Sequence, residues 1–311
     1  MSKIDQLIKN INAFVQKAES DEVEEIKATV ADFPELQDIP SLVEEYEKIT
    51  AKLLRLQRRT FLNELNGFIS KDDSETLESI LAFFQNDLFA ADEFAELFGK
   101  ETAIFLTLTV TQLAEKIMNS IDADIPFKVL SEKTEQWIES WSQELAQLMK
   151  LNTHTAIEQT LKEGIKEGRS IQEIELELKD LPEFSRKRAR VTAVTEVLTA
   201  SSVAQHESYV QCPAVTGKKW KHSGGKKNQS RESHVQLDGT IIPLDEEFEI
   251  PGSGERCMFP RDTQLTPKER VNCHCAVGPV VDPVILGLSA EEKEKIRNEF
   301  TKHGFFSRFI S

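Results

Sequence analysis

Cys273 and Cys275 are the residues whose type and spacing most directly suggest chemistry in this chain. In an extended segment, residues two apart point to the same face, so both thiols would face one way. Two thiolates supply half of a tetrahedral zinc site, and Cys257 and His234 are the candidates for the other two ligands. His222 is a further imidazole that would serve. Zinc is therefore the one cofactor that the sequence predicts.

The spacing of the two cysteines leaves other interpretations open. One residue separates them, whereas paired cysteines in structural zinc sites have about two to four residues between them. The thiols would then be buried and reduced in a core, or they would form a redox pair. Four cysteines in 311 residues do not make a disulfide framework, so in a reducing cytosol we expect free thiols or metal ligands.

Arg231 and His234 are the second candidate pair. Three residues apart, at a turn or a strand start, they would bind a phosphate or work as an acid and a base. A metal-dependent nuclease would also need carboxylates, and Asp238, Asp245 and Asp262 follow within a short distance. Arginine–aspartate pairs more often fix loops in small domains, so a structural role is favoured.

A third candidate is a dense basic stretch that contains one tryptophan. It would contact DNA phosphates without sequence specificity, with the indole stacking on a base. The alternative is an exposed loop that only adds solubility. The residues predicted to contact nucleic acid are Lys218, Lys219, Trp220, Lys221, Lys226, Lys227 and Arg231.

The composition limits the classes of protein. The formal net charge is −15 and 29% of the residues are charged, which indicates a soluble protein that does not coat nucleic acid in general. No apolar run approaches the roughly 18 residues that span a bilayer, and the start of the chain has no apolar core of a signal peptide. We therefore expect no membrane segment, and at most a local contact with DNA.

Hydrophobic residues recur at helical spacing through the first two thirds of the chain. Residues 103–110 are rich enough in β-branched side chains to form a strand, but the helical spacing continues beyond them, so they are interpreted as buried helix. Gly168 is expected to cap one helix, and Ser170 with Glu173 forms the pattern of a capping box. The predicted helical segments are 3–70 with proline breaks, 74–121, 132–168, a short helix ending at 181, and 184–208.

The periodicity changes after residue 213, where short β-forming runs alternate with glycine- and proline-containing turns. Asp238-Gly239 is predicted to form a type I′ hairpin turn, because both residues accept a positive φ. A polar helix capped by Ser289 is expected over 289–303. The predicted strands are 214–216, 235–237, 240–242, 248–250 and 276–281.

These patterns predict an α+β fold in which a long, mostly α-helical N-terminal region precedes a small C-terminal α+β domain. The sheet of that domain is expected to pack on the helix over 184–208. The expected segments are a partner-binding helical region (1–130), helices that pack on the C-terminal domain (131–208), the α+β domain (209–285), and a helix with an apolar tail containing Phe305, Phe306, Phe309 and Ile310 (286–311).

Between residues 218 and 275 the candidate residues follow one another in a defined order: Arg231, His234, Asp238, Gly239, Phe248, Pro260, Asp262, Asn272, Cys273 and Cys275. This succession resembles the C-terminal domain of phage head morphogenesis proteins, the family of the Mu F protein and the SPP1 minor head protein. The resemblance covers about residues 130–282, and the Thr195-Glu196 pair fits it as well. Val194 and His274 stand where that family usually has arginine.

The resemblance implies a minor head protein that associates with the portal and lies inside the capsid of the virion. Such a protein would act by binding, in head assembly or DNA delivery, with portal, head and scaffold proteins as partners and the packaged DNA as a possible contact. The apolar tail, residues 304–311, would be covered by a partner or by the protein's own fold.

An enzyme is the alternative, because similar C-terminal domains also occur joined to toxin modules. It would be a metal-dependent nuclease or a toxin-like effector that uses the region of Arg231, His234, Cys273 and Cys275. The sequence contains no P-loop, nucleophile elbow, HExxH or paired-carboxylate motif. We therefore expect no enzymatic activity and no catalytic residue.

Overall fold

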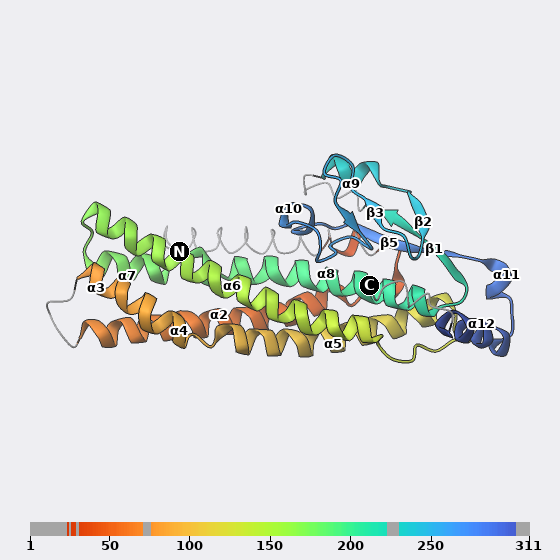
Figure 1. Ribbon diagram of the computed structural model, residues 1–311, viewed down its shortest axis with the longest axis horizontal. Coiled ribbons are helices and arrows are strands. Elements are labelled where there is room, and N and C mark those ends of the chain that lie inside the picture. Colours follow the sequence, from red (N-terminus) through yellow and green to blue (C-terminus); the bar gives the residue numbers. More distant parts are fainter. Residues whose placement is uncertain (1–23, 25, 29–30, 71–75, 223–229, 303–311) are drawn as a thin grey trace, which may run out of the picture. The chain divides into compact units, whose positions relative to one another are not determined.

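The computed structural model describes residues 24, 26–28, 31–70, 76–222 and 230–302 (Figure 1). The predicted apolar tail, residues 304–311, lies outside the described residues, as do residues 3–23, 25, 29 and 30 of the first predicted helical segment. The described chain divides into two compact units, each made of non-contiguous segments. We call residues 43–108 and 132–194 the helical unit. Residues up to 42, 109–131 and 195–311 form the sheet unit. Three long helices contribute residues to both units.

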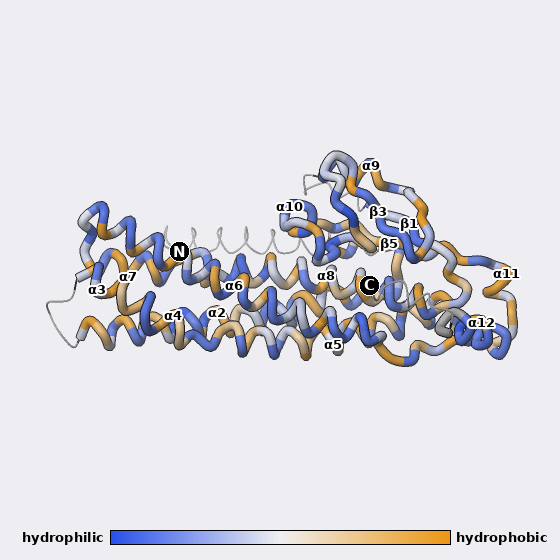
Figure 2. Tube along the Cα trace, viewed as in Figure 1, coloured by the Kyte–Doolittle hydropathy of each residue, from blue (hydrophilic) through white to orange (hydrophobic). Residues whose placement is uncertain are grey.

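Most of the described residues in the first two thirds of the chain are helical, as predicted. The run over 103–110 lies inside a helix and not in a strand. Figure 2 shows hydrophobic and hydrophilic residues alternating along the long helices, as their amphipathic spacing requires. The elements are η1 (Pro34–Leu36), α2 (Ile39–Ile69), α3 (Leu77–Phe83), the π-helix η2 (Phe84–Leu88), α4 (Phe89–Ala91), α5 (Phe94–Ile121), α6 (Glu132–Glu167), α7 (Ile171–Lys179), η3 (Pro182–Phe184) and α8 (Arg186–Gln211).

The ends of α6 and α7 follow from local sequence. Gly168 ends α6 with a φ of 67°, a left-handed conformation that glycine adopts without steric cost. Ser170 and Glu173 form the predicted capping box: Ser170 Oγ accepts from the Glu173 amide, and the Glu173 carboxylate accepts from the Ser170 amide. Local hydrogen bonds therefore set this turn.

The core of the helical unit is rich in phenylalanine. Phe61, Phe84 and Phe184 are buried in one cluster with leucines and isoleucines from α2, α3, α6 and α7. A buried polar group joins three helical segments beside this cluster. The Asp92 carboxylate accepts from Gln57 Nε2 at 2.7 Å and is paired with His154 Nε2 at 2.8 Å.

The sheet unit contains a three-stranded antiparallel sheet in the order β2-β1-β5 and a separate two-stranded ribbon, β3-β4. Gln205 and Tyr209 of α8 both donate to the Val277 carbonyl of β5, at 2.9 and 3.0 Å. The sheet therefore packs on the C-terminal part of α8, as predicted. Its elements are β1 (Val215–Lys221), α9 (Glu232–Gln236), β2 (Ile241–Pro243), β3 (Phe248–Glu249), β4 (Arg256–Cys257), α10 (Pro267–Arg270), β5 (Ala276–Val281), α11 (Pro283–Leu286) and α12 (Ala290–Lys302).

Two sequence predictions about this unit were wrong. Residues 235–237 do not form a strand, because 232–236 form the helix α9. The turn at Asp238-Gly239 is not a type I′ hairpin turn, since Gly239 has a φ of 80° but Asp238 is not in the positive-φ region. This turn instead leads from α9 into β2. The first predicted strand was also too short, since β1 continues to Lys221.

The last described helix is fixed by a buried ion pair. Ser289 caps α12 as predicted, and its hydroxyl accepts from the Glu292 amide. Lys293 Nζ lies 2.8 Å from Asp122 Oδ2, and both side chains are almost fully buried. None of the described helices is long and apolar enough to cross a membrane.

Candidate metal centre

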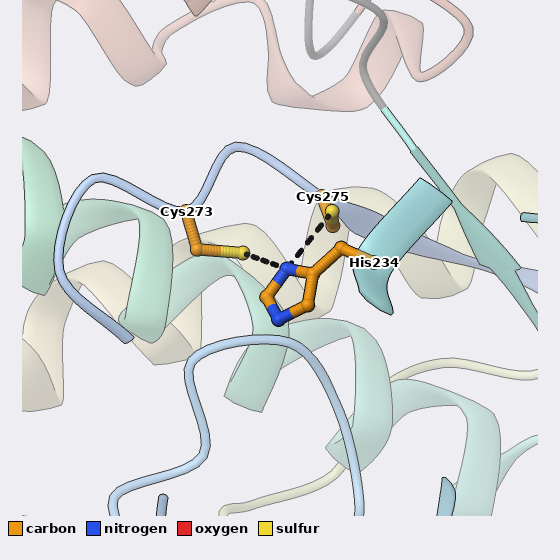
Figure 3. Close-up of side chains that lie close together, drawn as sticks. All are labelled: His234, Cys273 and Cys275. Carbon is orange, nitrogen blue, oxygen red and sulfur yellow. Dashed lines mark hydrogen bonds between the residues drawn. The ribbon is translucent and has the colours of Figure 1, made fainter. Parts of the chain in front are cut away.

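Three predicted ligand residues come together in the sheet unit. His234 lies on α9, and Cys273 and Cys275 lie in the segment that leads into β5. The His234 Nδ1 atom is 3.5 Å from Cys273 Sγ and 3.7 Å from Cys275 Sγ. One ligand atom from each residue lies within 4.8 Å of the other two, and all three residues are buried. Figure 3 shows the imidazole pointing toward both sulfur atoms.

The sequence predicted that the two sulfurs lie on one side because side chains alternate along a strand, but the structure places them together in another way. Residues 273–275 precede β5 and are not part of it. Asn272 adopts a left-handed conformation with a φ of 55°, which turns the chain just before Cys273. The thiols are nevertheless on the same side, facing α9.

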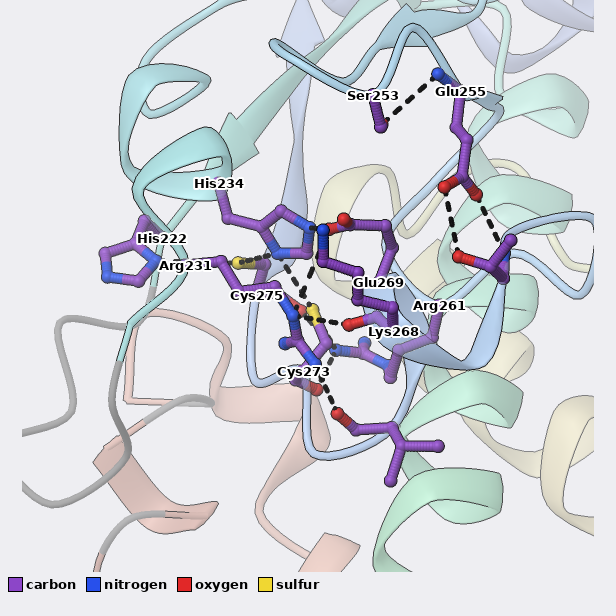
Figure 4. Close-up of polar contacts among 12 residues, drawn as sticks. His222, Arg231, His234, Ser253, Glu255, Arg261, Lys268, Glu269, Cys273 and Cys275 are labelled. Atoms are coloured by element: carbon purple, nitrogen blue, oxygen red, sulfur yellow. Dashed lines mark hydrogen bonds and ion pairs between the residues drawn. The ribbon is translucent and has the colours of Figure 1, made fainter.

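A second ring of polar contacts surrounds the three ligand residues (Figure 4). His234 Nε2 is 3.0 Å from Glu269 Oε2 of α10, and both side chains are buried. Because a carboxylate only accepts, Nε2 carries a proton, and Nδ1 is the ring nitrogen that faces the two sulfurs. The buried Arg261 guanidinium donates to the carbonyls of Cys273 and Cys275, at 2.8 and 2.6 Å. These contacts fix both the ring and the cysteine backbone.

The site favours negative charge on sulfur. The pKa of the Cys273 thiol is well below its ordinary value, chiefly because Cys275 donates a hydrogen bond to it, while His234 and Arg261 add to the effect against burial. The same hydrogen bond, together with burial, raises the pKa of Cys275. The buried Trp220 side chain acts in the opposite direction and moderates this rise. Such an environment is unlike that of inert core thiols, which have apolar neighbours.

The remaining predicted ligands lie at different distances from this group. His222 Nδ1 is 3.6 Å from Cys275 Sγ, and the His222 amide donates to Asp238 Oδ1 at 2.8 Å. Cys257 is buried but is not a member of the group. Burial raises the pKa of Cys257 well above its ordinary value, so this thiol stays protonated.

Arg231 has a structural role, because its side chain binds backbone carbonyls. Its guanidinium donates to the carbonyls of Lys268 and Val271, each at 2.7 Å, and so holds the loop after α10 against α9. Asp262 likewise binds its own loop, accepting from the Met258 amide at 2.9 Å. Asp245 lies apart from both, in an acidic hollow with Glu246, Glu247, Glu249 and Arg256. Arg231 and His234 both lie near the Glu269 carboxylate, at 3.9 and 3.0 Å, but within the described residues Asp245 and Asp262 do not join it in a carboxylate cluster of the kind a nuclease needs.

The other family-type residues support the fold of the site. The Phe248 ring packs edge-on against Trp220 at 5.1 Å between centroids, and Pro260 is buried beside Arg261 in sequence. Gly239 adopts a positive φ in the turn before β2, and Asn272 does so before the cysteines.

The predicted nucleic-acid residues that the structure describes do not form one exposed surface. Lys218 and Trp220 are buried in β1, so neither is available to a phosphate or a base. Lys221 Nζ is paired with Asp32 Oδ2 at 2.8 Å. Lys219 is half-buried on the same strand. Lys226 and Lys227 lie outside the described residues.

Sequence reasoning missed two residues of the site, Arg261 and Glu269. Arg261 stands between the motif residues Pro260 and Asp262, and its φ of 66° is the kind of constraint that a sequence does not reveal. Glu269 belongs to a four-residue helix that has no periodicity of its own. Their roles follow only from distances across the folded chain.

Comparison with known proteins places these features in context. The family model described as Phage Mu protein F like protein matches residues 155–278, which include α8, β1, α9 and all three converging ligands. The chain is 58% identical over 299 residues to the uncharacterized protein YqbB of Bacillus subtilis (strain 168), covering 96% of this chain and 98% of that protein. No solved structure matches the chain significantly.

A second relative carries a named activity. The chain is 30% identical over 190 residues to the NAD(+)–arginine ADP-ribosyltransferase EFV of Enterococcus faecalis (strain ATCC 700802 / V583). The match covers 60% of this chain but only 36% of that protein, so most of the transferase has no counterpart here.

Proposed function

We propose that this chain, which belongs to the phage Mu protein F like family of head morphogenesis proteins, is a minor head protein. It would bind the portal and be packaged inside the capsid. The protein would act by binding, in head assembly or DNA delivery, together with other head and scaffold proteins. The observation that carries the binding role is an apolar stripe on α5 of the helical unit.

The stripe consists of Leu97, Ile104 and Leu108. They are 38%, 50% and 57% exposed, respectively, in a region where polar residues would be the rule. Spacings of seven and four residues bring all three to the same face of a helix. Burying one such side chain against a partner contributes about 1.5–3 kcal/mol, so three of them provide a sufficient anchor for a helix-in-groove contact.

The test is co-expression with the portal protein of the same genetic element, followed by affinity purification. We expect the wild-type chain to co-purify with the portal, and an Ile104→Asp/Leu108→Asp double variant to bind at least about 30-fold more weakly, since about 2 kcal/mol is lost. Gln136→Asp introduces an aspartate at an exposed position of α6, with one negative charge against the two of the double variant, and is the control. The proposal fails if the wild-type chain associates with neither portal nor procapsid.

Contact with packaged DNA would be light, because burial removes Lys218 and Trp220 from the predicted basic surface. We expect Lys226 and Lys227 to account for most of it, which corresponds to a salt slope of about −2 for two phosphate contacts. Affinity measured at several salt concentrations for the wild-type chain and a Lys226→Ala/Lys227→Ala variant tests this. A wild-type slope much steeper than −2 would contradict it.

An ADP-ribosyltransferase activity is the second candidate, favoured by the relative that carries that name. A hollow of about 500 Å³ in the sheet unit is lined by Asp245, Glu246, Glu247, Glu249 and Arg256. Four carboxylates against one guanidinium repel the pyrophosphate of NAD⁺, which argues against this hollow as its site. Incubating the chain with labelled NAD⁺ and arginine-containing acceptors should give no transfer. Transfer, or metal-dependent cleavage of DNA that His234→Ala abolishes, would overturn the binding role.

A further inference from the structure

Of the residues that the structure describes, one group has three metal-ligand side chains converging on a point: His234, Cys273 and Cys275. We propose that this group binds one structural Zn²⁺ ion, with His222 as the fourth ligand. The ion would join α9, the end of β1 and the segment before β5, which are far apart in the sequence. The inference does not depend on the portal-binding role.

The separations between ligand atoms match those of a tetrahedral zinc ion. With Zn–S of about 2.3 Å and Zn–N of about 2.0–2.1 Å, a tetrahedral angle places nitrogen and sulfur about 3.6 Å apart. The three nitrogen–sulfur distances here are 3.5 Å from His234 to Cys273, 3.7 Å from His234 to Cys275, and 3.6 Å from His222 to Cys275. Hydrogen bonds between a thiol and an imidazole have the same length, so the ion is indicated by the convergence of three ligand atoms within 4.8 Å of one another together with these distances.

The surroundings of the ligands resemble those of a built metal site. A metal-binding imidazole usually donates its other N–H to a carboxylate, and His234 does so to the buried Glu269 at 3.0 Å. Zn²⁺ and two thiolates sum to zero charge, while Glu269 and the buried Arg261 cancel each other. The group thus becomes neutral when the ion binds, which removes the cost of burying unpaired charge.

Two residues compete for the fourth position, and the structure favours His222. Its Nδ1 already contacts Cys275 Sγ, its amide is held by Asp238, and its Nε2 lies 3.1 Å from Ser230 Oγ. A rotation of this half-buried side chain brings Nδ1 toward the other ligands. His222 and Cys257 both lie outside the converging group, but of the two only His222 has a described hydrogen-bond contact with one of its sulfurs.

The experiment measures metal directly in the full chain. Protein purified without chelator should contain about one zinc per chain by elemental analysis. After chelation, titration with Co²⁺ should give the intense visible absorption of a tetrahedral S₂N₂ site together with a thiolate charge-transfer band. A Cys273→Ser/Cys275→Ser variant should lose both signals. Glu269→Gln, which keeps all ligands, should weaken zinc binding about 10–100-fold.

Cys257→Ala is the matched control, because it removes a buried thiol of the same unit without touching the proposed ligands. It should keep one zinc per chain, whereas His222→Ala should bind more weakly and change the Co²⁺ spectrum. If a ligand variant fails to fold, the cobalt titration of the wild-type chain and the Glu269→Gln affinity still decide the question. Folded wild-type protein that contains no zinc and binds neither Zn²⁺ nor Co²⁺ overturns the proposal. So does loss of zinc in Cys257→Ala but not in the cysteine double variant.

Discussion

Lys218 is a buried cation with no carboxylate within ion-pairing distance among the described residues, and replacing it should stabilise the protein. The side chain lies on β1 and is 1% exposed. Its ammonium group is 5.5 Å from the centroid of the Phe248 ring and 3.9 Å from Met258 Sδ. Burial lowers its pKa from 10.5 to about 8, against the attraction of carboxylates that include Asp262. The folded state therefore holds this proton less tightly than the unfolded chain does.

The magnitude of the effect follows from the pKa values. A change from 10.5 to about 8 corresponds to about 3 kcal/mol, since each pKa unit is worth about 1.4 kcal/mol. Lys218→Met keeps most of the apolar stem and removes the charge, while it also loses the cation–π contact with Phe248, worth about 1–2 kcal/mol. We therefore expect Lys218→Met to raise the free energy of unfolding by about 1–2 kcal/mol at pH 7.

The pH dependence gives a sharper test than the single value. Between pH 8 and 10.5 the unfolded chain keeps the Lys218 proton and the folded state loses it, so wild-type stability gains with rising pH relative to the variant. The advantage of Lys218→Met should thus be complete below pH 8 and decline toward pH 10.5. Urea unfolding followed by circular dichroism and tryptophan fluorescence at pH 7 and pH 10 measures both values.

Lys219→Met, at the half-buried neighbouring position, is the control and should change stability by no more than about 0.5 kcal/mol at either pH. A Lys218→Met protein that is less stable than the wild type at pH 7 would refute the reasoning. A stability difference that stays the same at pH 7 and pH 10 would refute it as well.

Three further predictions concern stability, each measured by urea unfolding. Lys293→Met should cost about 3–5 kcal/mol, because it leaves the buried Asp122 carboxylate unpaired, and a cost below 1 kcal/mol would contradict this. Burial opposes ionisation of Asp92, but hydrogen bonds from His154 and Gln57 outweigh it and lower the pKa of this carboxyl group. The ionised carboxylate therefore stabilises the fold at neutral pH, and this stabilisation is lost as the pH falls through the lowered pKa. Asp92→Asn should therefore cost about 1–3 kcal/mol at pH 7 and less near pH 3. Gly217→Ala should cost about 1–3 kcal/mol, since its Cβ would lie 2.9 Å from the Ile242 carbonyl oxygen, whereas Gly67→Ala, with open space around it, should not destabilise.

The sequence by itself determined the helical two thirds of the chain, because helix formation depends on contacts within a few residues. The spacing of apolar residues predicted α5 through a stretch that resembles a strand, and the capping box at Ser170 set the start of α7. The strand over Ala276–Val281 was also correct, since its β-branched residues and flanking turn are local signals. The order of motifs likewise pointed to the phage head family that the comparison then showed.

The short elements around the candidate metal centre were decided by tertiary structure. His234 was expected at a turn or a strand start but lies on α9, a five-residue helix too short to be stable without its neighbours. Lys218 and Trp220 were expected in an exposed loop, yet pairing of β1 with both β2 and β5 makes it the central strand and buries them. The lysines of this segment predict an exposed segment, but they do not indicate which strands will pair with it on either side.

The candidate site itself combines both sources. The sequence indicated Cys273, Cys275 and His234 as ligands, because thiol and imidazole chemistry belongs to the residue type. Only the folded chain showed that Glu269 lies 3.0 Å from His234, and that Arg261 reaches the backbone of both cysteines. These partners are separated by 12 to 35 residues along the chain, and no local pattern specifies such distances; packing of α9 and α10 against the segment before β5 sets them.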